Sequence, residues 1–364
     1  YVHQTRNRGQ SWEIISEDLT TNDPTRQIKT GGLTPDDAGP TIAPVVFAIA
    51  ESPLREGLIW AGTNDGLVQM TRNGGRTWEN VTGNLEGLPP WGTVSNIEPS
   101  RYDEGICYLS VDLHQENDPR PYIYRTRDFG KTWVRIVNGI PESPLSYVHC
   151  VREDPTRRGL LYAGTENALY ISFDDGENWG SFQADLPHAP VYWITVQEHF
   201  NDLVVATYGR GFWILDDLTP IQQLTAETPA SDAHLFQPRP AYRFRRIESH
   251  MSQPGDPAAG ENPVYGAAVN FYLREVPEAD VSIRILDEDE KTVRRFSKQG
   301  PDDKLELRKG FNRLYWDLRL QSSRQGRLLT RPKEHAHVGL GDRGWRTNEE
   351  LRRRAAPLVP PGKY

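Results

Sequence analysis

The sequence predicts an all-β protein in which a partial β-propeller is followed by a small β-sandwich. A short motif, Ser/Thr-x-Asp/Asn-x-Gly-x-Ser/Thr/Asn-Trp, recurs along the 364 residues and ends at tryptophans spaced by 66, 55 and 46 residues. Strand-like runs flank each copy, and a repeat of this length is typical of propeller blades. The chain also holds 31 Gly and 28 Pro, which favours short strands joined by turns.

The motif itself predicts a tight hairpin. Its Asp or Asn accepts hydrogen bonds from backbone N–H groups of the turn, and its Gly takes a positive φ. The Trp that starts the returning strand packs over the hairpin and buries roughly 150–250 Å². We therefore expect a structural role, and not ligand binding, for the motif residues. These are Asn7, Gly9, Trp12, Asn73, Gly75, Trp78, Asp128, Gly130, Trp133, Asp174, Gly176 and Trp179.

Each repeat predicts a four-stranded blade. An inner strand such as 44–50 is followed by a second strand, which ends in Ala-Gly-Thr at Thr63 and again at Thr165. The motif hairpin then supplies the third and fourth strands. About four and a half blades result over residues 1–218, too few to close a ring, so we expect further blades upstream. The predicted pieces are two strands at 1–20, blades at 42–82, 93–138 and 146–184, and a unit without the motif at 191–217.

The remaining residues predict a linker and a second domain. Residues 219–262 are rich in proline and read as an extended linker. Residues 263–364 contain alternating strands, typical of an immunoglobulin-like or fibronectin-like sandwich. A basic stretch at 319–356 interrupts this pattern and reads as a solvated insertion, with an anion-binding patch as the alternative. The last residues read as the start of a strand, so we expect the sandwich to be truncated.

Composition limits the function classes. The formal net charge of -8 argues against a general nucleic-acid binder, and no apolar run is long enough to span a membrane. Cys107 and Cys150 lie in strand-like runs, which favours buried free thiols over a disulfide or a metal pair.

The loop after the second strand of one blade is a candidate site. It gathers Asp112, His114, Glu116 and Asp118, which could bind Ca²⁺ through oxygen ligands or supply an acid and a base. A solvated polar loop is the alternative. No other cofactor is expected.

Two further positions are candidates. Glu166 follows Ala-Gly-Thr and occupies a turn equivalent to that of Asp65, so it is a catalytic candidate, with a structural role as the alternative. Arg210 lies between two glycines, where it would either clamp an anionic ligand or pair with a carboxylate of a neighbouring blade.

Several strings resemble the bacterial Asp-box, or BNR, repeat propellers, which are sortilin-like and commonly labelled glycosyl hydrolases. They are Trp60-Ala-Gly-Thr-Asn-Asp-Gly66, Tyr208-Gly-Arg-Gly-Phe-Trp-Ile-Leu-Asp-Asp217 and Asn312-Arg-Leu-Tyr-Trp-Asp-Leu-Arg319. The resemblance implies four-stranded blades with Asp-box hairpins, an Ig-like C-terminal domain, and an extracellular, periplasmic or cell-envelope location. Tyr208 departs from the family pattern, in which His precedes Gly-Arg-Gly.

Three functions remain open, and one of them is an envelope scaffold without a small ligand; the other two involve a ligand or substrate. The first is a propeller that binds a peptide, protein or carbohydrate ligand through its loops. The second is a glycoside hydrolase, sialidase-like or xyloglucanase-like, with part of its site in blades missing upstream. A hydrolase needs two carboxylates across a groove, and blade spacing in the sequence does not pair them. Whether the protein is an enzyme is therefore undecided from the sequence.

Overall fold

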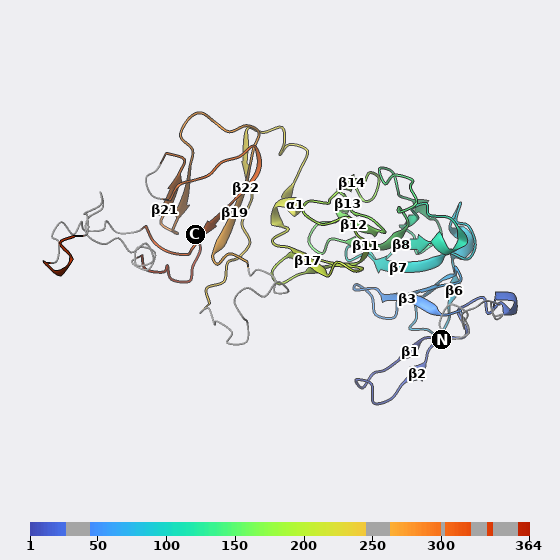
Figure 1. Ribbon diagram of the computed structural model, residues 1–364. Helices are drawn as coiled ribbons and strands as arrows, with labels where there is room; N and C mark the ends of the chain where they lie inside the picture. Colours follow the sequence, from blue (N-terminus) through green and yellow to red (C-terminus); the bar gives the residue numbers. More distant parts are fainter. Residues whose placement is uncertain (27–43, 245–262, 300–302, 322–332, 338–355) are drawn as a thin grey trace. The chain divides into compact units, whose positions relative to one another are not determined.

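The computed structural model describes residues 1–26, 44–244, 263–299, 303–321, 333–337 and 356–364. The chain divides into two compact units, Tyr1–Leu218 and Thr219–Tyr364. Regular structure is almost entirely antiparallel β-sheet in both units (Figure 1). The predicted all-β class with four-stranded blades is confirmed. No helix among the described residues combines the length and apolar character that a membrane crossing requires.

The first unit is a series of sheets whose strands follow sequence order. A two-stranded hairpin comes first, then three four-stranded sheets, then a three-stranded sheet, in the described part of the unit. The strands are β1 (His3–Gln4), β2 (Glu13–Ile14), β3 (Val46–Glu51), β4 (Ile59–Thr63), β5 (Val68–Thr71), β6 (Glu79–Asn80), β7 (Thr93–Pro99), β8 (Cys107–Asp112), β9 (Ile123–Thr126), β10 (Val134–Arg135), β11 (Val148–Glu153), β12 (Leu161–Thr165), β13 (Leu169–Ser172), β14 (Gly180–Ser181), β15 (Val191–Gln197), β16 (Asp202–Thr207) and β17 (Phe212–Leu215).

The inner strands β3, β7, β11 and β15 contact one another in that order, as the first strands of successive propeller blades do. Short 3-10 helices occupy connections between strands. They are η1 (Pro24–Arg26), η2 (Thr82–Asn84) and η3 (His114–Glu116), with η4 (Lys333–His335) in the second unit.

The four motif turns share one hydrogen-bond pattern. In the second copy the N–H of Thr77 donates to Oδ1 of Asn73 at 3.0 Å, and the N–H of Gly75 donates to Oγ1 of Thr71 at 3.0 Å. Gly75 has a φ of +87°, which favours glycine. Asn and Asp alternate between copies because both offer the acceptor oxygen. The equivalent backbone donors and acceptors are Ser11 to Asn7 at 2.9 Å, Thr132 to Asp128 at 2.9 Å and Asn178 to Asp174 at 2.8 Å.

The second and fourth copies of the motif also form a hydrogen bond to the preceding blade. Nε1–H of Trp78 donates to the carbonyl oxygen of Ile15 at 2.9 Å, and Nε1–H of Trp179 donates to that of Ile136 at 2.8 Å. The motif glycine lies against the same residue, so a Cβ on Gly75 would overlap Ile15. One short sequence therefore sets both the turn and the contact between blades.

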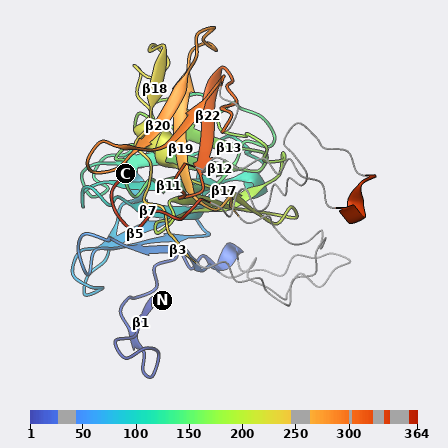
Figure 2. The same ribbon diagram turned by 90° about the vertical axis from the view of Figure 1, so that its left-hand side faces the viewer.

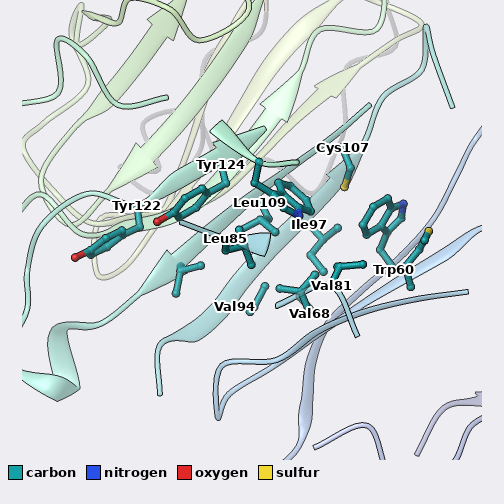
Figure 3. Close-up of a cluster of buried hydrophobic side chains, with 14 of the residues drawn as sticks. Trp60, Val68, Val81, Leu85, Val94, Ile97, Cys107, Leu109, Tyr122 and Tyr124 are labelled. Atoms are coloured by element: carbon teal, nitrogen blue, oxygen red, sulfur yellow. The ribbon is translucent and has the colours of Figure 1, made fainter. Parts of the chain in front are cut away.

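Hydrophobic cores lie between successive sheets. Figure 3 shows one of them, where side chains of the β3–β6 sheet such as Trp60 and Val68 form a single cluster with Leu109 and Tyr124 of the β7–β10 sheet. Burying such apolar surface contributes roughly 25 cal/mol per Å². Cys107 and Cys150 are both buried, and they form no disulfide.

The second unit holds two antiparallel sheets around one core. β18, β19 and β22 form one sheet, in which β19 and β22 lie side by side (Figure 2), and β20 pairs with β21 in the other. Its core includes Phe271, Phe296 and Trp316, with Val359 from the end of the chain. The strands are β18 (Ala233–Leu235), β19 (Ala267–Leu273), β20 (Ser282–Leu286), β21 (Thr292–Ser297) and β22 (Gly310–Trp316). The immunoglobulin-like assignment stays a prediction.

The segment 219–262, expected to be a linker, contributes regular structure to the second unit. It begins with helix α1 (Thr219–Gln223), and β18 pairs with β19. Phe236, directly after β18, is fully buried. Residues 245–262 and most of the basic stretch 319–356 lie outside the described residues.

Candidate functional site

A β-bulge occurs at the same place in each inner strand. Pairing with the second strand of the blade shifts register directly after Val46, Val94, Val148 and Val191. A bulge leaves one residue without a partner in the ladder and redirects its side chain, and bulges are frequent beside active sites. The redirected residues are Phe47, Ser95, His149 and Tyr192.

The end of each second strand lies beside the bulge. Val148 pairs with Thr165, so Glu166 follows directly after the paired position. The same register gives Asn64, Asp112 and Tyr208 as its equivalents in the other sheets. Glu166 therefore aligns with Asn64, whereas Asp65 lies one residue further along the equivalent turn and accepts a hydrogen bond from the N–H of Thr21 at 2.7 Å.

His149 and Glu166 form the centre of the site. His149 is 7% exposed, and its Nε2 lies 2.8 Å from Oε2 of Glu166. Because an ionised carboxylate only accepts hydrogen bonds, His149 is the donor. Burial raises the pKa of Tyr147, and a hydrogen bond to the Glu166 carboxylate raises it further. Tyr147 therefore stays protonated and acts as a second donor to Glu166.

Five rings form a continuous row across three sheets. Ring centroids are 4.5 Å apart between His114 and Tyr147, and 5.3 Å apart between Tyr147 and His149. His149 stacks on Tyr192 at 4.0 Å, and Tyr192 lies 5.5 Å from Tyr208. We call these five residues the aromatic row. Tyr192 is 48% exposed and Tyr208 is 72% exposed, so these two tyrosines are the part of the row most open to solvent on this side.

A second carboxylate lies beside the row. Nδ1 of His114 is 2.7 Å from Oδ1 of Asp112, so Asp112 orients one ring as Glu166 orients another. Burial raises the pKa of Tyr192, and the charges of Glu166 and Asp112 raise it further. The structure thus brings three sequence-predicted residues, Asp112, His114 and Glu166, to one place.

The rest of the candidate loop faces elsewhere. Asp118 accepts hydrogen bonds from Arg120 at 2.6 Å and from the hydroxyl of Tyr122 at 2.8 Å. The hydrogen bond from Arg120 holds the pKa of Asp118 well below its usual range. The described residues include no group of three or more His, Cys, Asp or Glu able to hold a metal ion.

Arg210 lies in the turn that follows Tyr208. The flanking Gly209 and Gly211 have positive φ values of 80° and 72°. The carbonyl oxygen of Arg210 accepts a hydrogen bond from Nε1–H of Trp213 at 3.0 Å. Among the described residues no carboxylate forms an ion pair with Arg210, so the expected lock to a neighbouring blade is not seen there.

Sequence reasoning missed Tyr147, His149 and Tyr192. A signal for His149 and Tyr192 was present, because an aromatic or polar residue follows valine at the same position of each inner strand, as in Val148-His149 and Val191-Tyr192. These residues break the alternation expected of a strand, and the bulge explains the break.

No family model matches the chain. The chain is 33% identical over 120 residues to "Vacuolar protein sorting/targeting protein 10" of Pyrenophora teres f. teres, which covers 29% of this chain and 7% of the relative. It is 24% identical over 246 residues to a "Probable oligoxyloglucan-reducing end-specific xyloglucanase" of Neosartorya fischeri, which covers 60% of this chain and 28% of the relative. The chain thus spans less than a third of the curated relatives it matches.

Among solved structures, YCF48 from Cyanidioschyzon merolae matches with a TM-score of 0.37 and 22% identity, over 47% of this chain and 53% of that one. By sequence, the chain is similar to parts of a sorting protein and of a xyloglucanase.

Proposed function

We propose that the chain is a binding module that holds a peptide, protein or carbohydrate ligand at the aromatic row. The observation that carries this proposal is the row itself. Its two exposed tyrosines, Tyr192 and Tyr208, lie at one end of a row that also holds the carboxylates Glu166 and Asp112. Exposed aromatic faces with a few fixed polar groups are common features of ligand sites.

The hydrogen bonds favour binding over hydrolysis. Glu166 is engaged by His149, and Asp112 is engaged by His114. Each carboxylate therefore orients a ring, whereas a glycosidase needs one to reach the leaving group and the other to reach water or the sugar. The raised pKa of Tyr147 also opposes a nucleophilic role, which requires a more readily ionised hydroxyl.

The test is a binding titration of the chain with panels of peptides and oligosaccharides. We expect a member of either panel to bind, and Tyr192→Ala to weaken it about tenfold, since losing a well-packed ring commonly costs over 1 kcal/mol. Trp12→Ala is the matched control, because Trp12 is 60% exposed on the distant β1–β2 hairpin. Equal binding by the Tyr192 variant and the parent chain would contradict the proposal.

A glycoside hydrolase is the second candidate, and the similarity to a xyloglucanase over 246 residues favours it. In that case Asp112 and Glu166 would be the reacting carboxylates. Turnover of xyloglucan oligosaccharides or sialosides that disappears in Asp112→Asn and Glu166→Gln would establish it. Turnover that both variants retain would place the reaction elsewhere.

We further propose that the protein works outside the cytoplasm, in the extracellular space or the cell envelope. The resemblance to Asp-box repeat proteins supports this location. Fractionation of cells that express the full gene tests it, and a signal confined to the cytoplasm would refute it.

A further inference from the structure

The aromatic row combines exposed rings with negative charge that no nearby cation balances. The rings of Tyr192 and Tyr208 meet at 32° with centroids 5.5 Å apart. The charges of Glu166 and Asp112 both raise the pKa of Tyr192. Among the described residues, neither carboxylate forms an ion pair with a Lys or Arg, since the partners are His149 for Glu166 and His114 for Asp112. A cation is the ligand that gains from both the ring faces and the carboxylates.

The low exposure of the two carboxylates limits which cations can reach them. The side chain of Glu166 is 22% exposed and that of Asp112 is 13% exposed. A lysine side chain is a compact charge on a slender, flexible stem, so it can pass along the ring faces and still approach the carboxylates.

We propose that the aromatic row binds the cationic side chain of a lysine in a peptide, with Tyr192 and Tyr208 as ring faces and Glu166 and Asp112 as counter-charges. This inference rests on the proposed binding function and names the ligand chemistry for the same site. His149 and Tyr147 hold the carboxylate of Glu166 in place, and His114 holds that of Asp112.

The experiment compares two probes on the parent chain. Both are five-residue glycine peptides with blocked ends, one with a central lysine and the other with a central norleucine, which has no charge. We expect the lysine peptide to bind about tenfold tighter, because cation–π and ionic contacts add on a partly desolvated site. Raising NaCl from about 0.05 M to about 0.5 M should weaken the lysine peptide selectively, since salt screens charges. Equal affinities would overturn the inference.

Variants then locate the effect. Glu166→Gln and Asp112→Asn keep hydrogen-bond acceptors but remove the charges, so each should lower the ratio of lysine to norleucine affinity several-fold. Asp118→Asn is the matched control, because Asp118 lies in the same loop but its charge is already bound by Arg120. The site would be refuted if Glu166→Gln and Asp112→Asn left the ratio of lysine to norleucine affinity unchanged. It would also be refuted if Asp118→Asn lowered that ratio by the same factor. Circular dichroism confirms that each variant is folded.

Other outcomes separate this inference from the proposed function. One outcome is that neutral peptides or oligosaccharides bind, that Tyr192→Ala weakens them, and that lysine gives no advantage. This outcome would support the proposed binding function but would overturn the inference that the ligand is a cation. Another outcome is that a glucosamine oligomer binds as tightly as the lysine peptide and depends on Glu166 in the same way. The ligand would then be a cationic sugar, and the inference of a lysine in a peptide would be overturned. Failure of every peptide and oligosaccharide to bind the folded chain would overturn both.

Discussion

At the residue scale, His149 shows how backbone geometry positions a functional side chain. The bulge in β11 turns it out of the ladder, and the turn after β12 places Glu166 within hydrogen-bond reach. Its ring then fills the space between Tyr147 and Tyr192. Because the ring is almost fully buried, we assign it a positioning role for Glu166 and Tyr192.

Replacing His149 by alanine should destabilise the first unit. The change removes two ring contacts and one hydrogen bond, each of which contributes about 1 kcal/mol. We expect the free energy of unfolding to fall by about 2–3 kcal/mol, measured by urea denaturation. His188→Ala is the control, because His188 is exposed and its side chain hydrogen-bonds to the carbonyl oxygen of Asn167 at 3.2 Å. Similar small losses in both variants would contradict the role given to His149.

The pH dependence of stability should carry a contribution from Glu98. Burial raises the pKa of Glu98 despite its 2.6 Å ion pair with Arg152. A raised folded-state pKa gives stability that is complete below the unfolded pKa of about 4.3 and is lost as pH rises through the folded value. Relative to Glu98→Gln, the parent chain should therefore lose unfolding free energy as pH rises above about 4.3. Urea unfolding over a pH series measures this, and the opposite trend would refute it.

At the element scale, the motif hairpin connects the blades. Its tryptophan and its glycine both contact the preceding blade, as Trp78 and Gly75 contact Ile15. The hairpin therefore cannot be treated as a local turn alone. This dual role explains why Gly recurs in all copies, whereas the acceptor varies between Asn and Asp.

Two adjacent glycines separate these roles. Gly74 and Gly75 both have positive φ, at 70° and 87°, but a Cβ on Gly74 meets nothing within 4 Å whereas one on Gly75 would overlap Ile15. Gly74→Ala should cost about 1–2 kcal/mol of unfolding free energy from backbone strain alone. Gly75→Ala should cost clearly more, because overpacking adds about 1–3 kcal/mol. Thermal and urea unfolding measure both, and equal losses would show that the contact with Ile15 is unimportant.

At the scale of the whole molecule, the sequence predicted the repeats better than the site. Turn chemistry and strand alternation are local, so the blades and the motif hairpins could be read from residues close in the chain. The aromatic row was not predictable in this way, because His149 and Tyr192 belong to separate repeats, and residues close in the chain do not show which rings of neighbouring blades meet. Strand β18 was missed for a related reason, since three residues carry too little periodicity.

The most direct test of the account is the affinity of the parent chain and of Tyr192→Ala for the tightest ligand in the peptide and oligosaccharide panels. The account predicts that the variant stays folded and binds about tenfold more weakly, while Trp12→Ala binds as the parent does. Unchanged affinity in Tyr192→Ala would contradict the assignment of the aromatic row as the binding site.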